Sequence, residues 1–124
     1  MKEQEFERVL WAIMQIRCNP SATEEELHVQ LLSALDAAGL CPQHEVRLAP
    51  RCRIDVMCGG IGIEIKKKRP VPSALRAQLE RYAACVQVER LVVVAPRSVN
   101  LPRQIGGKPV HMVGLERLWG VSLP

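Results

Sequence analysis

Aromatic side chains are scarce in this sequence of 124 residues, which holds one tyrosine, one phenylalanine and two tryptophans. Stacking of ligand rings on aromatic side chains is therefore poorly supported as a main binding mode. No apolar run reaches the ~18 residues that a membrane span needs. The opening residues, MKEQEFERVL, show neither the basic start nor the apolar stretch of a secretory signal. We therefore expect a soluble, cytoplasmic protein that makes no membrane contact.

The cysteines exclude two common uses of that residue. There are five of them, an odd number, and no two form a C-x-x-C pair, so neither a disulfide framework nor a zinc ribbon is indicated. We expect reduced thiols that are mostly buried. The length fits a single domain over residues 1–124 with one hydrophobic core.

Charge is distributed unevenly along the chain. Residues 1–46 carry 3 basic and 8 acidic side chains, whereas residues 47–108 carry 13 basic and 4 acidic ones. A positive middle segment is a hint of a polyanionic partner. The alternative is that lysine and arginine simply coat a solvated surface.

Three helices are predicted. Residues 3–17 carry apolar side chains at three- and four-residue steps, which is typical of an amphipathic helix. Ser21 and Glu24 match an S-x-x-E capping box, and the second helix that follows is expected to end at Gly39. A third helix is predicted over residues 74–88, capped by the serine that precedes it.

Strands are predicted where the apolar period changes to two or where a short run is wholly apolar. Residues 98–108 are expected to form a loop because of Pro102 and Gly106-Gly107. The order of the elements is α-α-β-β-β-α-β-β, which indicates an α/β protein. The predicted strands cover residues 45–48, 53–57, 61–67, 91–95 and 110–113.

The stretch RIDVMCGGIGIEIK, residues 53–66, places two carboxylates within two apolar strands. A turn centred on Gly59-Gly60 pairs Asp55 with Glu64, and Arg53 with Lys66. Because side chains alternate across a strand, these four residues are expected to form one purely polar face. The opposite, apolar face is expected to hold Ile54, Val56, Ile61, Ile63 and Ile65.

The polar face has the composition of a cation site. Two carboxylates whose Cβ atoms lie about 5 Å apart repel each other unless a cation sits between them. The cluster contains oxygen ligands and no cysteine or histidine, which favours Mg²⁺ or Mn²⁺ over zinc or copper. Lys66 could stabilise developing negative charge or help to activate a water. The alternative is two surface ion pairs on the exposed face of a sheet.

Two motifs resemble those of the PD-(D/E)XK nuclease superfamily. Arg53-Ile54-Asp55 and Glu64-Ile65-Lys66 match its R-x-D and E-x-K elements, with isoleucine in place of the signature proline. Gln78-Leu79-Glu80-Arg81-Tyr82 is similar to the Q-x-x-x-Y motif of the RecB-like branch, which includes small phage and bacterial nucleases. The resemblance implies a restriction-endonuclease-like core, in which helices flank a mixed central sheet.

The resemblance also implies roles for individual residues. Asp55, Glu64 and the backbone carbonyl of Ile65 would bind the metal, Lys66 would assist the nucleophilic water, and Gln78 would contact the active site or the substrate strand. Gln78 has an alternative interpretation as an ordinary buried amide.

The family also places a glutamate on the helix before the sheet. Helical geometry puts Glu24 on the arc of the apolar residues, with Glu25 in reserve, and leaves Glu26 to favour the helix N-terminus. His28, one turn after Glu24, could face the same site. A satisfied histidine at the edge of the core is the preferred interpretation.

Basic residues after the hairpin are candidates for sequence-independent phosphate contacts. The predicted function is thus hydrolysis of DNA by a Mg²⁺- or Mn²⁺-dependent deoxyribonuclease with no organic cofactor. A homodimer is one oligomeric state that would let such a small core reach a duplex. One alternative is a non-catalytic module on the same fold that binds nucleic acid or protein. Another is a Holliday-junction resolvase. The predicted nucleic-acid contacts are Arg53, Lys67, Lys68, Arg69, Arg76 and Tyr82, with Arg81 on the same helix as the last two.

Overall fold

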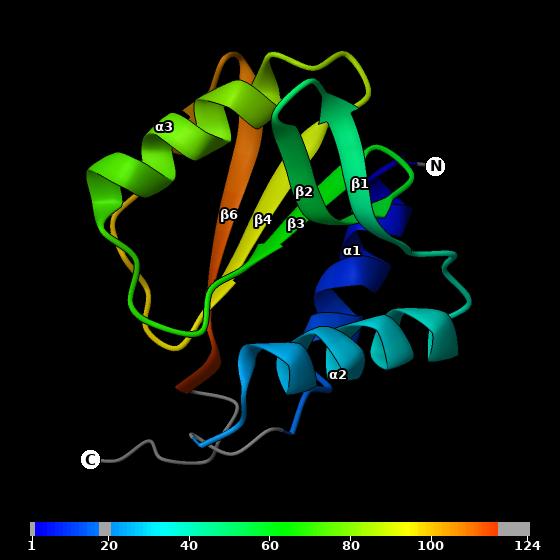
Figure 1. Cartoon of the computed structure of the whole chain (residues 1–124). Helices are drawn as coiled ribbons and strands as arrows, with labels where there is room; N and C mark the ends of the chain where they lie inside the picture. The colour runs from blue at the N-terminus through cyan, green and yellow to red at the C-terminus, as the bar shows by residue number, and fades with distance from the viewer. Residues whose placement is uncertain (1, 18–20, 117–124) are drawn as a thin grey trace.

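A computed structural model shows a mixed sheet with helices on both faces (Figure 1). It describes residues 2–17 and 21–116. The α/β class is confirmed, and the described segments contain three helices and six strands. In chain order these are α1 (Lys2–Ile13), α2 (Glu24–Ala37), β1 (Gln43–Ala49), β2 (Cys52–Cys58), β3 (Ile61–Ile65), α3 (Pro72–Ala83), β4 (Arg90–Ala95), β5 (Gln104–Ile105) and β6 (Lys108–Gly114).

The strands lie in the order β1-β2-β3-β4-β6-β5. The first three form an antiparallel meander, while β3 and β4 run parallel because α3 carries the chain back between them. β4 also pairs in parallel with β6. The sheet is therefore mixed, as predicted. Its central strands β3 and β4 are almost wholly buried and, apart from Glu64 and Arg90, carry no charged side chain, as expected for strands covered on both faces.

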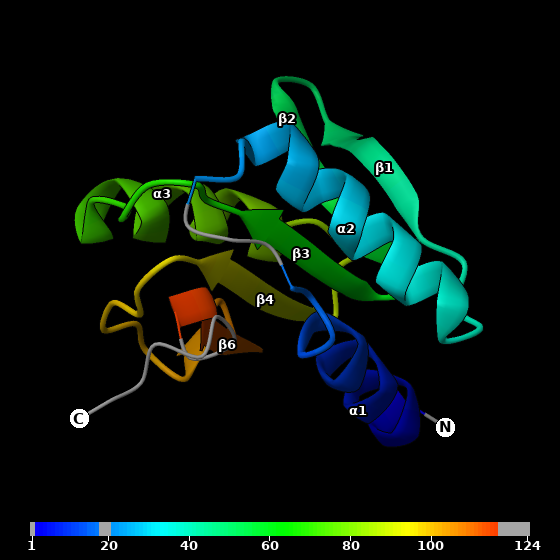
Figure 2. The ribbon, with the colours of Figure 1, turned by 90° about the horizontal axis from the view of Figure 1, so that it is seen from below.

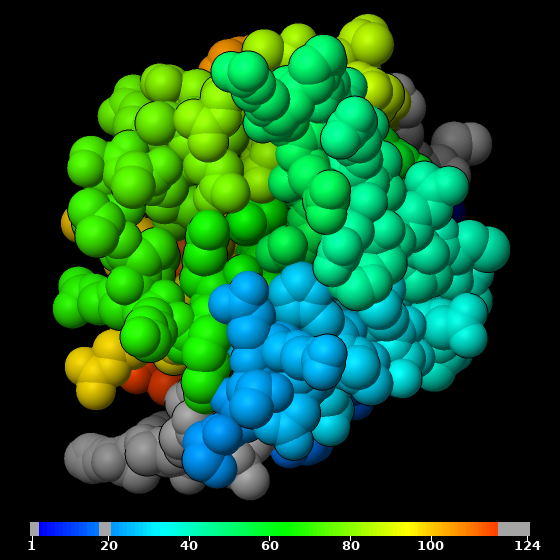
Figure 3. Space-filling model, viewed as in Figure 1, coloured from blue at the N-terminus to red at the C-terminus, as the bar shows by residue number. Residues whose placement is uncertain are grey.

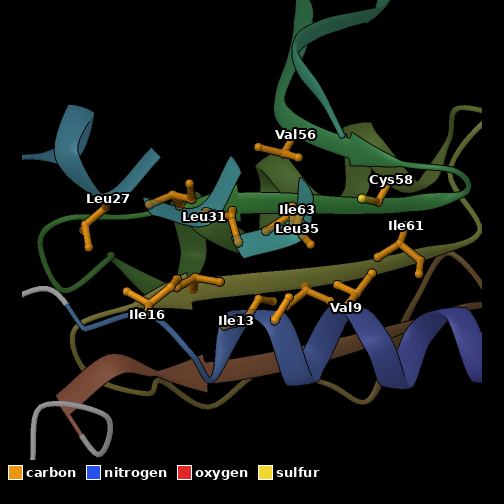
Figure 4. Close-up of a cluster of buried hydrophobic side chains, with 14 of the residues drawn as sticks. Val9, Ile13, Ile16, Leu27, Leu31, Leu35, Val56, Cys58, Ile61 and Ile63 are labelled. Carbon is orange, nitrogen blue, oxygen red and sulfur yellow. The ribbon is translucent and has the colours of Figure 1, made fainter. Parts of the chain in front are cut away.

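Two hydrophobic clusters lie on opposite faces of this sheet. In Figure 2 the strands run between α3 on one side and α1 with α2 on the other. The first cluster packs α1 and α2 on β3, with Leu31 and Leu35 next to Ile63 (Figure 4). The second packs α3 on the other face through Leu75 and Leu79. A site on β2 or β3 can therefore receive side chains from α2 on one face and from α3 on the other.

Several predicted helix ends were wrong. α1 ends at Ile13, and Met14, predicted to be on its apolar face, is 52% exposed. Thr23, not Ser21, caps α2: its Oγ1 accepts from the Glu26 amide at 3.1 Å, and Glu26 Oε1 accepts from the Thr23 amide at 2.7 Å. The capping box is thus T-x-x-E, two residues after the predicted one.

The third helix also differs from its prediction. α3 begins with Pro72 at N1 after Val71, so Ser73 lies inside the helix rather than at its cap. It ends at Ala83, where the chain turns through the bonds Cys85 N–Tyr82 O and Val88 N–Cys85 O toward β4. The C-terminal prediction for α2 was confirmed, because Gly39 has φ +81° and the amide of Leu40 bonds back to the Leu35 carbonyl.

The predicted loop over residues 98–108 contains a short strand. Gln104–Ile105 pairs with Lys108–Pro109 across Gly106-Gly107, whose φ values of +59° and +78° are those of a tight hairpin turn. Such a two-residue strand is too short to give a period in the sequence.

The described cysteines are free thiols, of which Cys52 and Cys58 are buried, Cys85 is half-buried and Cys41 is exposed. Cys18 lies outside the described residues. None of the described helices is long and apolar enough to span a membrane.

Candidate active site between two parted strands

The hairpin register around Gly59-Gly60 was predicted correctly. Val56 pairs with Ile63 and Cys58 with Ile61, so Asp55 and Glu64 follow as the next opposed positions. The pairing of β2 with β3 stops before them, while β2 continues along β1 and β3 along β4. In Figure 1 the β1–β2 hairpin rises away from β3 at this point. The two carboxylates therefore lie where the strands part.

Side-chain hydrogen bonds bridge the gap between the parted strands. The Ile65 amide donates to Asp55 Oδ2 at 2.8 Å, and the Asp55 amide lies 3.4 Å from Glu64 Oε1. Each carboxylate thus accepts from the opposite strand, in place of a backbone carbonyl.

The parting also changes which face the apolar side chains take. Ile54 was predicted to share a face with Val56, but it packs in the cluster under α3, whereas Val56 packs under α1 and α2. The prediction of one pure polar face was therefore wrong, because it assumed a regular ladder up to Arg53. Lys66 lies just beyond the end of β3, and Arg53 points its exposed side chain toward Glu45 at 3.4 Å.

Glu64 is held from α3 by a closed hydrogen-bond network. Its Oε1 lies 2.9 Å from the Tyr82 hydroxyl, and its Oε2 accepts from Gln78 Nε2 at 3.1 Å. The Tyr82 hydroxyl also lies 2.9 Å from the Arg53 carbonyl and accepts from Gln78 Nε2 at 3.0 Å. Lys66 Nζ lies 3.4 Å from Glu64 Oε2. We call Glu64, Gln78 and Tyr82 the closed half of the site.

Asp55 is approached from α2 by side chains that do not yet bond to it. His28 Nε2 lies 3.8 Å from Asp55 Oδ2 and 3.9 Å from Glu24 Oε2, both beyond hydrogen-bond length. His28 is 9% exposed, and its Nε2 is buried with no hydrogen-bond partner among residues 2–17 and 21–116. We call Asp55, Glu24 and His28 the open half of the site. The preferred interpretation of His28 as a satisfied histidine was therefore wrong.

Both carboxylates have a raised pKa. Burial, reinforced by the Asp55 charge, raises the pKa of Glu64 to about 7, although Lys66 and the Tyr82 hydrogen bond oppose the rise. Burial also raises the pKa of Asp55, against the opposing effects of the Ile65 amide and of His28. Burial next to Glu64 raises the pKa of Tyr82, which keeps its hydroxyl a donor. The site therefore favours loss of negative charge or gain of a positive one.

A basic cavity adjoins the closed half. Its volume is about 600 Å³, and it lies between the start of α2 and α3, beside Gln78. Figure 3 shows the blue surface of the first α2 residues next to the green surface of the segment from β3 to α3. The lining cations are Lys66, Lys67, Lys68, Arg69 and Arg81.

One predicted nucleic-acid contact does not fit this placement, and a second lies outside the lining of the cavity. Tyr82 is 2% exposed and bonded within the closed half, so a nucleic acid does not reach its side chain. Arg76 is paired with Glu80 at 3.7 Å and does not line the cavity, whereas Arg81 does. Helical spacing puts these two arginines on different sides of α3. The prediction did not assign the arginines to sides of the helix.

A second, smaller cavity borders the open half and was missed from the sequence. Its volume is about 240 Å³, and Glu24, Glu25, His28, His44 and Glu45 line it. Glu24, the preferred helix carboxylate, lines both cavities, whereas Glu25 lines only the smaller of these two. No sequence signal identified His44 or Glu45, because their position depends on how β1 pairs with β2.

The donors of the open half fit a divalent cation. Bonds of about 2.0–2.2 Å from nitrogen and oxygen to a metal allow donor pairs 3.8 and 3.9 Å apart to share one ion. In the described segments no three His, Cys, Asp or Glu side chains are already gathered as a metal would hold them. Both oxygens of Glu64 are engaged by Gln78 and Tyr82, so this carboxylate is not turned toward the other donors. The Glu24 side chain is 56% exposed and free to turn.

Comparison with known proteins gives no relative of this chain. No protein-family model matches it, and no curated protein or solved structure matches it either.

Proposed function

We propose that this protein is a divalent-metal-dependent nuclease of the PD-(D/E)XK type that hydrolyses phosphodiester bonds in DNA. The observation that best supports the proposal is the pair Asp55 and Glu64 at the parting of β2 and β3, with Lys66 3.4 Å from Glu64. Among the described residues, His28 Nε2 is buried and has no hydrogen-bond partner. A purely structural cluster of ion pairs gives no reason for such a nitrogen. Perturbed carboxylates next to a cavity are typical of functional sites.

The proposed metal ligands are Asp55, Glu64 and the backbone carbonyl of Ile65. From α2, Glu24 and His28 complete the set. An imidazole nitrogen among oxygen donors favours Mn²⁺ over Mg²⁺, which prefers oxygen ligands alone. A bound divalent cation would polarise the phosphate and lower the pKa of a water. Glu64 must lose its proton before it binds a metal, and its pKa is raised to about 7. Activity should therefore rise as the pH increases through neutrality.

The chain's own side chains have distinct proposed roles. Lys66, beside Glu64, offsets negative charge that develops on the phosphate and orients the attacking water. Gln78 and Tyr82 hold Glu64 in place from α3. The lysines and arginines of the basic cavity bind the phosphates of the strand, without reading its sequence. DNA as the substrate and the cytoplasm as the compartment belong to this proposal.

The test is cleavage of a substrate panel in Mn²⁺ by the wild type and by Asp55→Asn, Glu64→Gln and Lys66→Ala. The panel contains linear, closed circular, single-stranded, flapped and four-way-junction DNA. The wild type should cleave at least one of them, and Lys66→Ala should lose roughly 10²- to 10⁴-fold in rate while it still binds the metal. Arg103→Ala, an exposed residue outside the site, is the matched control and should cleave like the wild type.

The outcomes separate the alternatives. Binding of DNA by the wild type without any cleavage would support the non-catalytic module. Cleavage confined to four-way junctions by a dimer would identify a resolvase. Full activity in all three site variants would refute the proposed centre.

A further inference from the structure

The inference concerns His44, which contacts His28 on the side away from the metal ligands. His28 Nδ1 and His44 Nε2 are 3.2 Å apart, and their rings meet edge to face with centroids 5.4 Å apart. One hydrogen must lie between these two nitrogens, so one ring donates and the other accepts. The choice decides which nitrogen of His28 carries its proton.

Only one tautomer of His28 is compatible with cation binding. If Nδ1 carries the proton, it donates to His44 Nε2 and leaves a lone pair on the buried Nε2, directed between Asp55 and Glu24. If Nε2 carries the proton, a buried N–H faces those carboxylates at 3.8 and 3.9 Å, too far for a hydrogen bond. Both arrangements satisfy His28 Nδ1, but only the first leaves Nε2 able to bind a cation.

The backbone of β1 is distorted at the position that brings His44 to α2. His44 pairs with Val56 and Val46 with Ile54, so Glu45 lies opposite Asp55, but with φ +52°. A left-handed conformation in a non-glycine residue is uncommon and tends to occur at functional sites. In a regular strand His44 and Glu45 would face opposite sides, whereas here both line the smaller cavity with His28.

The surroundings of His44 allow its Nε2 to accept a hydrogen bond. Glu45 Oε2 lies 3.6 Å from His44 Nε2, beyond hydrogen-bond length, and Arg53 draws the same carboxylate through Oε1 at 3.4 Å, so Glu45 does not fix a proton on that nitrogen. The His44 side chain is 41% exposed, so water can satisfy its ring in either tautomer. His44 can therefore follow the tautomer of His28 at little cost, while the buried His28 cannot exchange its partner for water.

We propose that His44 is a positioning residue for the metal site: its Nε2 accepts a hydrogen bond from His28 Nδ1–H and keeps His28 Nε2 unprotonated and directed at Asp55 and Glu24. This inference rests on the proposed function for the use of the lone pair, but the tautomer is a property of the metal-free protein. A hydrogen-bonded partner of a metal-binding histidine typically changes metal affinity 10- to 100-fold.

The experiment compares two variants that differ in whether they can accept the hydrogen bond. His44→Gln keeps an acceptor oxygen, whereas His44→Phe keeps an aromatic ring and removes the acceptor. We expect His44→Phe to bind Mn²⁺ roughly 10- to 100-fold more weakly by calorimetry, and His44→Gln to stay within a few-fold of the wild type. Wild-type affinity in a folded His44→Phe would overturn the inference.

A second readout does not depend on metal binding. Nitrogen-15 NMR of histidine-labelled, metal-free wild type reports which ring nitrogen of His28 is protonated. A proton on Nδ1 supports the inference even if His44→Phe fails to fold, and a proton on Nε2 overturns it. If the wild type shows Nδ1–H but binds no Mn²⁺, the proposed function fails, and of the inference only the hydrogen bond from His28 Nδ1–H to His44 stands.

Discussion

The two halves of the site differ in how completely their polar atoms are satisfied. On the α3 side, Glu64, Gln78 and Tyr82 bond to one another and to the Arg53 carbonyl. On the α2 side, His28 Nε2 lies 3.8 Å from Asp55 and 3.9 Å from Glu24, and this nitrogen has no hydrogen-bond partner in the described segments. The closed half thus resembles a buried structural network, whereas the open half leaves room for an ion.

One sheet can support both halves of the site because β2 and β3 part between them. A continuous ladder would use the amides of Asp55 and Ile65 for backbone bonds, and the carboxylates would then lie on a single face. With the ladder interrupted, side chains of α3 hold Glu64 in place, and α2 brings His28 close to Asp55. Changes of Gln78 and Tyr82 in the closed half should therefore alter mainly folding stability, whereas changes in the open half, or of Glu64 itself, should alter metal binding.

The largest effect is expected from Tyr82→Ala. It removes a buried aromatic ring and should lower the free energy of unfolding by about 3–5 kcal/mol, measured by urea denaturation. Tyr82→Phe removes only the hydroxyl and should cost about 1–3 kcal/mol, because the one O–H that Glu64 and the Arg53 carbonyl share is lost from a buried site. A loss below about 0.5 kcal/mol in Tyr82→Ala would mean that the closed half is not structural.

The next effect is a pH dependence that comes from Glu64. Its pKa rises from 4.5 to about 7 on folding, so between these pH values the native state binds more protons than the unfolded state. The free energy of unfolding of the metal-free protein should therefore fall as pH rises across this range, by about 3 kcal/mol.

Glu64→Gln isolates this contribution, because its amide cannot ionise. Denaturation curves of the variant should show a much weaker fall in stability between pH 4.5 and 7. Glu80→Gln, at an exposed ion pair, is the control and should behave like the wild type. Equal slopes in wild type and Glu64→Gln would contradict the raised pKa.

The open half should respond in the opposite way to its own variant. His28→Leu removes a buried nitrogen that has no partner among the described residues, together with one hydrogen bond to the partly exposed His44, so the metal-free protein should change in stability by less than about 1 kcal/mol. At 100-fold excess over its Kd, Mn²⁺ should stabilise the wild type by about 2.7 kcal/mol and the variant far less. Thermal unfolding with and without Mn²⁺ measures both, and equal Mn²⁺ stabilisation would exclude His28 as a ligand.

The smallest effect is expected at Glu45, where φ is +52°. Glu45→Gly should raise the free energy of unfolding by up to about 1 kcal/mol, because glycine adopts this conformation without strain. Arg51→Gly, at φ +60° in the turn between β1 and β2, is the matched control. Chemical denaturation should show similar small gains for both, and a clear loss in Glu45→Gly would show that its side chain does more than tolerate the distortion.

Local sequence signals predicted much of the fold. The Gly59-Gly60 turn gave the correct hairpin register, and Gly39 marked the end of α2. Helix starts were less well predicted, since Ser21 and Thr23 both lie three residues before a glutamate and only the structure distinguishes them. The third helix begins at Pro72, two residues before its predicted start, because the fixed φ of proline suits the first position of a helix.

The candidate site was predicted in part. Period-two alternation identified Asp55 and Glu64, and helical geometry chose Glu24, which the structure brings near His28. The parting of β2 from β3 was not predictable, because it depends on the pairing of β3 with β4 and of β2 with β1, far apart in sequence. For the same reason His44 and Glu45 gave no signal, and Ile54 and Tyr82 were assigned to the wrong surroundings.

The most direct test of a cation site in the open half is anomalous diffraction from crystals soaked in Mn²⁺. We predict one strong Mn²⁺ peak about 2.0–2.2 Å from an oxygen of Asp55 and from His28 Nε2, with Glu64 close by. The same peak should be absent in crystals of Asp55→Asn. Crystals that take up Mn²⁺ elsewhere, and show no peak between Asp55 and His28, would contradict the account.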